Sequence, residues 1–203
     1  MLRSNFARLA FAGAFVSVVG ASYAQTIFNY DSILSGDTPT GAPTFASLLI
    51  EDIAPDQVKM TLTPSAAADP DQFLSRLFLN VDSSIAGLTL ESSNSFLQGF
   101  TYSQDSQNYG GGAYDLNLNF DIAPPADRLF AGRTAEMVFS GTGLNANSFS
   151  FMANNGSYTA LHLQGLDKGG SAHVTAAPVP EPASMIALGV GAALLAARRR
   201  RKS

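Results

Sequence analysis

Residues 116–122 read LNLNFDI, and this stretch decides the fold class. Leu116, Leu118, Phe120 and Ile122 alternate with polar residues, so every second side chain is apolar. A period of two places apolar side chains on one face of a β-sheet and polar side chains on the other. The stretch therefore predicts a half-buried β-strand.

The same alternation recurs elsewhere in the chain, first in VKMTLT at residues 58–63. Further strands are expected at residues 77–81, 88–91, 137–140, 148–152, 160–164 and 172–175. Turn signals separate them at Pro55-Asp56, Gly110-Gly111-Gly112, Pro124-Pro125, Asn155-Gly156 and Gly169-Gly170. The pattern predicts an all-β fold, an antiparallel β-sandwich with jelly-roll-like connectivity.

Two segments make sharper local predictions. The Asn155-Gly156 step lies between alternating runs at residues 149–152 and 158–163, which is a strong signal for a β-hairpin. The segment Pro70–Leu79 is the one helical alternative, because its apolar residues have i, i+4 spacing. A helix of one or two turns is the most that this segment allows.

The first 24 residues have the organisation of a secretory signal peptide. Two arginines precede an apolar run at residues 9–19, and the small residues Ser22 and Ala24 precede Gln25. An apolar run of about 11 residues is too short to span roughly 30 Å of hydrocarbon. We expect signal peptidase to cleave between Ala24 and Gln25, so that the protein is exported.

The body that would follow, residues 25–177, is acidic and has no cysteine. It holds five cations against fifteen carboxylates, a formal charge of −10. An acidic body disfavours binding to nucleic acid and to anionic lipid. The absence of cysteine excludes disulfides, thiolate metal sites and thiol catalysis.

Two histidines are the natural starting point for a catalytic hypothesis. His162 and His173 could be combined with Ser and Asp residues into a triad or a metal site, but the chain has no Gly-x-Ser-x-Gly or His-Glu-x-x-His motif. His162 lies between Leu161 and Leu163, as a residue on the polar face of a strand would. We expect no catalytic residues, and an exported hydrolase is the weakest alternative.

Calcium is the only cofactor that the sequence leaves open. Asp69-Pro70-Asp71 and the stretch DSQNYG at residues 105–110 carry clustered oxygen ligands. The second stretch resembles the start of a calcium loop, but its third position is Gln107 and its twelfth is Leu116, where a bidentate Glu is needed. A solvated acidic loop is the favoured interpretation.

A ligand-binding role is the main alternative to a passive structural role. Tyr102, Tyr109 and Tyr114, together with Gly110 to Gly112, could form an aromatic platform for sugar rings. Such residues more often serve as core and turn residues of a sandwich. A glycan-binding or adhesive module therefore remains an alternative.

The carboxyl-terminal end reads VPEPASMIALGVGAALLAARRRRKS at residues 179–203. The apolar run 183–197 would be about 22 Å long as a helix, which predicts a short transmembrane segment. A cytoplasmic stop signal is formed by the five cations Arg198, Arg199, Arg200, Arg201 and Lys202. The signal peptide and the tail then agree on one topology, with the body outside the inner membrane.

The order of Pro180-Glu181-Pro182, the apolar run and the arginine cluster resembles the PEP-CTERM sorting signal of exported proteins in Gram-negative and related bacteria. Some classifications place the same element under the C-terminal domain of ice-binding proteins, a label that implies no ice binding. Residues 141–151 and 158–174 also resemble recurrent segments near that signal.

The resemblance implies processing by exosortase, a membrane transpeptidase, with Pro180, Glu181 and Pro182 as its recognition residues. It implies three parts: a signal peptide (1–24), a β-sandwich (25–177) and a sorting signal (178–203). The expected function is that of a non-enzymatic protein, tethered transiently in the inner membrane and then delivered to the cell surface or an exopolysaccharide (biofilm) matrix. Polysaccharide is a candidate partner there, and nucleic acid is not expected to be one.

Overall fold

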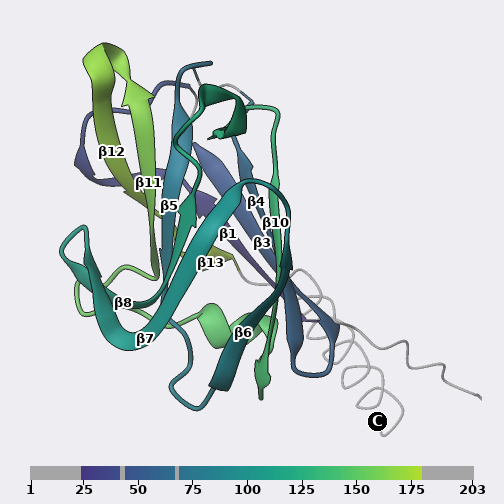
Figure 1. Cartoon of the computed structure of the whole chain (residues 1–203). Coiled ribbons are helices and arrows are strands. Elements are labelled where there is room, and N and C mark those ends of the chain that lie inside the picture. Colours follow the sequence, from purple (N-terminus) through teal and green to yellow (C-terminus); the bar gives the residue numbers. More distant parts are fainter. Residues whose placement is uncertain (1–23, 42–43, 67–68, 180–203) are drawn as a thin grey trace, which may run out of the picture.

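The computed structural model describes residues 24–41, 44–66 and 69–179, and in this part of the chain nearly all regular structure is β-strand (Figure 1). One sheet, here called sheet A, contains β1 (Gln25–Tyr30), β3 (Ala46–Ala54), β4 (Gln57–Pro64), β6 (Ala86–Ser93), β10 (Ala135–Thr142) and β13 (Pro178–Val179). Sheet B contains β2 (Ser32–Gly36), β5 (Phe73–Leu79), β7 (Leu97–Tyr109), β8 (Gly112–Phe120), β9 (Leu129–Phe130), β11 (Thr159–Leu166) and β12 (Gly170–Thr175).

The strand order is β13-β1-β3-β4-β10-β6 in sheet A and β2-β12-β11-β5-β8-β7 in sheet B, where β9 pairs with β5 beside this path. Every strand pair in the described residues is antiparallel. The described residues also contain three short 3₁₀ helices, which lie in connections: η1 (Pro125–Asp127), η2 (Ala146–Phe149) and η3 (Asp167–Gly169). The prediction of an all-β, antiparallel sandwich is confirmed.

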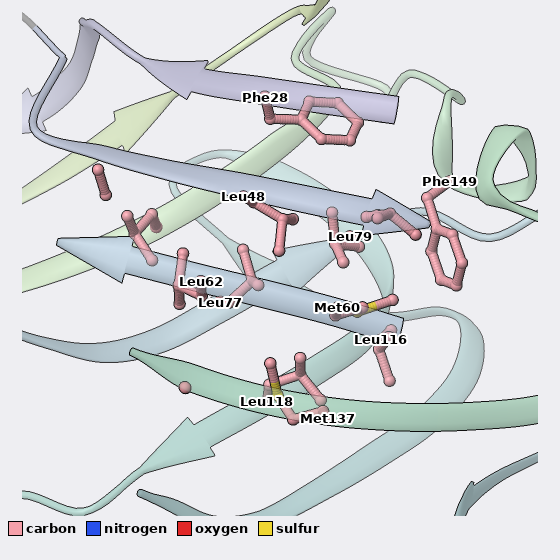
Figure 2. Close-up of a cluster of buried hydrophobic side chains, with 14 of the residues drawn as sticks. Phe28, Leu48, Met60, Leu62, Leu77, Leu79, Leu116, Leu118, Met137 and Phe149 are labelled. Carbon is pink, nitrogen blue, oxygen red and sulfur yellow. The ribbon is translucent and has the colours of Figure 1, made fainter. Parts of the chain in front are cut away.

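The two sheets share one hydrophobic core. Figure 2 shows side chains from both sheets meeting between them, and η2 adds Phe149 at one side. The labelled residues are Phe28, Leu48, Met60, Leu62, Leu77, Leu79, Leu116, Leu118, Met137 and Phe149, each at most 1% exposed. Burying each such side chain contributes about 1.5–3 kcal/mol, so this interface between the sheets provides the main stabilisation.

Tyr30 joins the sheets through a polar contact inside this core. Its hydroxyl lies 2.8 Å from Oγ1 of Thr159, which in turn donates to the carbonyl of Phe78 at 2.7 Å. Burial raises the pKa of the fully buried Tyr30. A buried hydroxyl must find a partner, and here the partner ties β1 to β11 across the sandwich.

The opening stretch behaves as its alternation predicts. Leu116, Leu118 and Phe120 are buried in β8, whereas Ile122 lies beyond the end of the strand and is 48% exposed. The strands expected near residues 58–63, 77–81, 88–91, 137–140, 160–164 and 172–175 correspond to β4, β5, β6, β10, β11 and β12.

The helical alternative for Pro70–Leu79 is wrong, because residues 73–79 form β5. Both faces of this strand are covered: Leu77 lies in the main core, whereas Phe78 lies in a second cluster on the outer face of sheet B. A strand that is buried on both faces loses its alternation. That loss left the i, i+4 spacing as the only visible pattern.

The strand expected at residues 148–152 is also wrong. Asn145 caps η2 by accepting a hydrogen bond from the amide of Asn147, and the Ser148 hydroxyl accepts one from the amide of Asn145. These local side-chain bonds favour a helical turn over a strand. The Asn155-Gly156 step is a turn, but it joins a loop to β11, so the expected hairpin between two strands does not form.

The described body begins and ends at one edge of sheet A. β1 starts at Gln25, and the carbonyl of Ala24 accepts a hydrogen bond from the amide of Asp52 at 2.9 Å. The expected signal peptide up to residue 23, the apolar run 183–197 and the cations 198–202 lie outside the described residues. Within the described part, no helix is long and apolar enough to cross a membrane.

Candidate functional site

A row of polar positions crosses the outer face of sheet B. Strand register places them side by side in the order Ser35 (β2), His173 (β12), His162 (β11), Arg76 (β5), Asn119 (β8) and Gly99 (β7). Neighbouring strands lie about 4.8 Å apart, so this polar row is about 24 Å long. Its residues are exposed or half-buried, and they are therefore accessible to a ligand.

The two histidines face each other across β11 and β12, with ring centroids 4.9 Å apart. Each ring is held by a serine: Oγ of Ser75 lies 2.8 Å from Nδ1 of His162, and Oγ of Ser35 lies 2.7 Å from Nδ1 of His173. The strand register shifts beside each histidine, and such bulges change the direction of side chains. The serine contacts fix the orientation of both rings.

Arg76 carries the charge of the polar row at neutral pH. Burial, followed by the charges of His173 and Arg76, lowers the pKa of His162 from 6.5 to about 4. Burial also lowers the pKa of His173. Both imidazoles are therefore neutral near pH 7, and Arg76 is left as the cation.

The guanidinium of Arg76 is exposed and has no hydrogen-bond or ion-pair partner among the described residues. Of the other four cations in residues 25–177, Lys168 is exposed on the η3 turn and the other three are engaged. Lys59 lies 2.7 Å from Glu136, Arg128 donates to the carbonyl of Ile122 at 2.8 Å, and Arg133 donates to the carbonyl of Arg128 at 3.1 Å. Arg76 therefore keeps its full capacity to donate.

A pocket of about 220 Å³ lies beside Arg76. Neutral amides line it from three strands, through Gln98 on β7, Asn119 on β8 and Gln164 on β11. Tyr109 and His162 form further parts of the wall, and no carboxylate lines the pocket. The pocket therefore offers hydrogen-bond donors and acceptors around one positive charge.

Tyr109 lies between this pocket and a small apolar cluster on the same face. Its ring stacks on Phe78 with centroids 4.1 Å apart and meets His173 edge to face at 4.4 Å. The Tyr109 hydroxyl is buried without a hydrogen-bond partner in the described chain, and burial raises its pKa. An unpaired buried hydroxyl is costly, so the ring contacts with Phe78 and His173 must hold Tyr109 in this place.

The turn of the β7–β8 hairpin is hydrogen-bonded to the loop before β11, which holds the hairpin over the outer face of sheet B. Asn155 donates from Nδ2 to the carbonyl of Gly110 at 3.3 Å, and the amide of Ala113 donates to Oδ1 of Asn154 at 2.9 Å. Figure 1 shows the paired ribbons of β7 and β8 curving away from the line of the other strands. These contacts position Tyr109 against the histidines.

The buried carboxylate of Asp115 stabilises the bend of β7 and β8. Asp115 is 4% exposed and accepts from the amide of Asp105 at 2.6 Å and from the amide of Val81 at 2.8 Å. Asp105 has a positive φ of 50°, and the strand register jumps between Tyr102 and Gln107. The residues proposed as a calcium loop, 105–110, therefore belong to the bent part of β7 and the turn after it.

The three tyrosines considered as an alternative sugar platform do not share a surface, so a platform of all three does not form. Tyr114 is fully buried, and its hydroxyl is hydrogen-bonded to Ser157 at 2.6 Å. Tyr102 is half-buried and donates to the carbonyl of Ile85 at 3.4 Å. Only Tyr109 lines the pocket beside the polar row.

The acidic candidates do not converge on a metal site. Oδ1 of Asp69 accepts a hydrogen bond from the amide of Asp71 at 2.9 Å, which makes this pair a local turn. In residues 24–41, 44–66 and 69–179, no group of three or more histidines and carboxylates could hold a metal ion. His162 and His173 come together with serines, and neither accepts or donates a hydrogen bond to a carboxylate in this part of the chain.

The polar row was not visible in the sequence because its members lie far apart in the chain and meet only through strand register. Ser35 and His173, for example, are separated by 138 residues. The one usable signal was the outward position of His162 between two leucines. That signal identified a polar strand face without showing what lies beside it.

At the carboxyl-terminal end of the described body, β13 pairs with β1. Val179 lies opposite Ile27, and Pro178 lies opposite Phe28. The residues expected to be read by a sorting enzyme, Pro180 to Pro182, follow immediately and lie outside the described residues. The fold therefore fixes the point from which the tail leaves the body.

Comparison with known proteins identifies this tail. Residues 178–201 match the model of the PEP-CTERM protein-sorting motif, which indicates an exported protein that is processed at a membrane. The match begins at the first residue of β13, so the motif and the folded body share Pro178 and Val179. The search of curated proteins found no match.

One similar solved structure comes from Clostridium thermocellum. Its title describes biomass-sensing modules of Rsgi-like proteins that resemble the family 3 carbohydrate-binding module of the cellulosome. The similarity has a TM-score of 0.32 at 12% sequence identity and covers 77% of this chain and 99% of that chain. A similarity at this level says nothing about the ligand of the present protein.

Proposed function

We propose that this chain is a non-enzymatic exported protein that exosortase delivers to the cell surface or to an extracellular polysaccharide matrix. The observation that carries the proposal is the sorting motif at residues 178–201. The signal peptide (1–24) is removed between Ala24 and Gln25, and the sandwich (25–177) folds outside the inner membrane.

The tail has two roles in this proposal. The apolar run 183–197 halts in the inner membrane, and residues 198–202 remain on the cytoplasmic side because clustered cations resist translocation. Pro180, Glu181 and Pro182 are then read by exosortase. The membrane tether is transient, and processing releases the body to its final location.

The proposal includes no catalysis, and the serine–histidine pairs of the polar row support this. They are the nucleophile–base pairs that the row brings together, and each lacks the third member of a triad among the described residues. Ser75 and Ser35 contact Nδ1 of their histidines, and no carboxylate bonds to either ring in the described chain. A base with the lowered pKa of His162 is unprotonated at pH 7 but accepts a proton poorly. The pairs are better suited to holding the rings in place than to hydrolysis.

The substitution Glu181→Gln tests the sorting proposal. It barely changes hydrophobicity and lies outside the apolar run, so a simple membrane anchor should tolerate it. In a host with exosortase, we expect the variant to accumulate in the inner membrane with residues 198–202 still attached, and less protein to reach the surface. Intact-mass measurement and fractionation read out both effects.

A tail substitution outside the recognition residues, Ser184→Ala, is the matched control and should be processed like wild type. Equal cleavage of Glu181→Gln and wild type would show that Glu181 is not read by an enzyme. A wild-type chain that is never cleaved would make the tail an ordinary short anchor.

A second candidate function is glycan binding by the body. The pocket beside Arg76 favours it, because three amides, a tyrosine and a histidine surround an unpaired cation on an accessible sheet face. Binding of soluble glycans to the exported protein would test this function independently of the tail.

A further inference from the structure

The geometry points to a binding site for an acidic polysaccharide, a chain that contains uronic acid residues, along the polar row on sheet B. The inference deepens the glycan-binding candidate and rests on that candidate, whereas the sorting motif plays no part in it. Arg76 binds a sugar carboxylate, the amides of the pocket bind hydroxyl groups, and Tyr109 forms one wall of the pocket.

Arg76 sets the charge of the ligand. A guanidinium presents a planar pair of donors that matches the two oxygens of a carboxylate. The register neighbours of Arg76 are His162 and Asn119, which are both neutral at pH 7. Since no carboxylate lines the pocket, Arg76 is free to pair with a carboxylate of a ligand.

The amides select for hydroxyl groups. An Asn or Gln side chain offers two donors and an acceptor, and a sugar hydroxyl donates and accepts. Gln98, Asn119 and Gln164 supply such groups from β7, β8 and β11 around the same pocket. A simple anion such as phosphate would leave most of them unused.

The shape of the site favours a chain over a single sugar. The polar row is about 24 Å long at ordinary strand spacing, which is enough for several sugar rings. Gly99 ends the row on β7, and no neighbouring atom occupies the place where a side chain would project. The polar row is therefore unobstructed at that end.

Tyr109 supplies the remaining contact. Its hydroxyl lacks a partner in the described chain, although it is buried. Because that hydroxyl is closed off, Tyr109 contacts a ligand through its ring, which lines the pocket. The packing of Tyr109 on Phe78 and His173 keeps the wall rigid before a ligand binds.

The negative charge of the body does not oppose this site strongly. The formal charge of −10 is spread over residues 25–177, and exposed charges beyond about 8 Å are largely screened at physiological ionic strength. Local groups therefore decide binding. The long-range repulsion should mainly slow association at low salt.

The test uses the full chain, purified in detergent, and titration calorimetry with three oligosaccharides of equal length. These are oligogalacturonate, a neutral malto-oligosaccharide and a sulfated malto-oligosaccharide, which carries sulfate groups and no carboxylate. We expect oligogalacturonate to bind at least about tenfold more tightly than the neutral chain. The neutral chain cannot form the charge-assisted hydrogen bonds between Arg76 and a sugar carboxylate. It should also bind more tightly than the sulfated chain.

Arg76→Gln should lose about tenfold or more in affinity for oligogalacturonate, and Arg76→Lys should lose less because it keeps the charge. Lys168→Gln is the matched control, since it removes an exposed cation of the body outside the polar row. Asn119→Asp provides a second variant, in which the new carboxylate pairs with Arg76 and competes with the ligand. Circular dichroism verifies that each variant is folded.

Several results would overturn the inference. Equal losses in Arg76→Gln and Lys168→Gln would indicate binding by overall charge. Equal affinity for the neutral chain would remove the role of the carboxylate, and tighter binding of the sulfated chain would assign the site to another anion. Absence of binding to all three would also end the glycan candidate, whereas normal tail processing in Arg76→Gln would leave the sorting proposal intact.

Discussion

Each sheet has a cation on a central strand of its outer face, and the two cations differ in whether they have an ionic partner. On sheet A, Lys59 of β4 is paired with Glu136 of β10 at 2.7 Å. On sheet B, Arg76 of β5 lies among neutral residues and has no ionic partner in the described chain. Sheet A pairs its central cation within the chain, whereas sheet B leaves its central cation free to bind a molecule from outside.

This difference indicates where a ligand would bind. The described residues of the sandwich hold no metal cluster, so the outer faces of the sheets are the place to look. Both sheets are stabilised from the same core, so their inner faces do not distinguish them. The outer faces are free to differ. An unpaired guanidinium, an unpaired tyrosine hydroxyl and a pocket without carboxylates all lie on sheet B.

The largest effect is expected on protein stability, from substitutions on the two faces of β5. Leu77 is fully buried in the core, whereas the adjacent Arg76 is exposed on the outer face. Leu77→Ala should lower the free energy of unfolding by about 2–5 kcal/mol, and Arg76→Ala should change it by about 0.5 kcal/mol or less. Urea unfolding measures both. A large loss in Arg76→Ala would mean that the outer face is structural.

Acid should weaken the face of sheet B through its histidines. The folded-state pKa of His162 is about 4, below its ordinary 6.5, so the unfolded chain takes up the proton first as the pH falls. Stability is complete above about pH 6.5 and declines toward pH 4.

Melting temperatures at pH 7 and pH 5 test this decline. Protonation would place charge beside His173 and Arg76, which face His162, and against Tyr109. His162→Gln should show a smaller fall in Tm over that interval than wild type does. Identical falls would assign the acid sensitivity to other groups.

Two tyrosines of the β7–β8 hairpin should respond differently to loss of the hydroxyl. Tyr114→Phe removes a buried hydrogen bond to Ser157 and should cost about 1 kcal/mol. Tyr109→Phe removes a hydroxyl that has no partner in the described chain, so stability should stay the same or rise. Denaturant titration of both variants gives the comparison, and a cost for Tyr109→Phe equal to that of Tyr114→Phe would contradict it.

The smallest effect is expected on sheet A. The side chains of Lys59 and Glu136 are 34% and 52% exposed, and such surface pairs contribute about 1 kcal/mol or less. Lys59→Gln should therefore barely change stability and should leave oligogalacturonate binding unchanged. A clear loss of binding would mean that sheet A also contacts the ligand.

The alternation of apolar residues predicted the strands that have one buried and one open face. Residues 58–63 and 116–120 follow this rule in β4 and β8. β5 does not, because Phe78 is covered by Tyr109 from a hairpin about thirty residues away in the chain. The coverage depends on tertiary packing, which no local pattern shows.

The polar row was equally hard to predict, because its members meet only through the strand register. His162 was placed correctly on a polar face, but the sequence could not place Arg76 and His173 at its two sides. The sorting motif needed no folding at all, since it is read as a continuous stretch. The jelly-roll connectivity, the cleavage between Ala24 and Gln25, and the roles of residues 180–182 stay predictions.

The pairing of β13 with β1 has a mechanical consequence. When the tail is fixed and a polysaccharide pulls on sheet B, tension reaches the body through two residues, Pro178 and Val179. Pro178 has no amide hydrogen, so β13 should peel away before the core yields. Peeling should stop where Ala176 enters the core and Thr175 donates to the carbonyl of Thr159 at 2.7 Å.

Release of residues 177–179 would lengthen the tether by about 10 Å. We expect force spectroscopy on the tail to record this short, low-force extension before the cooperative unfolding of the sandwich. The edge of sheet A would then act as a compliant joint between the attachment point and the loaded face.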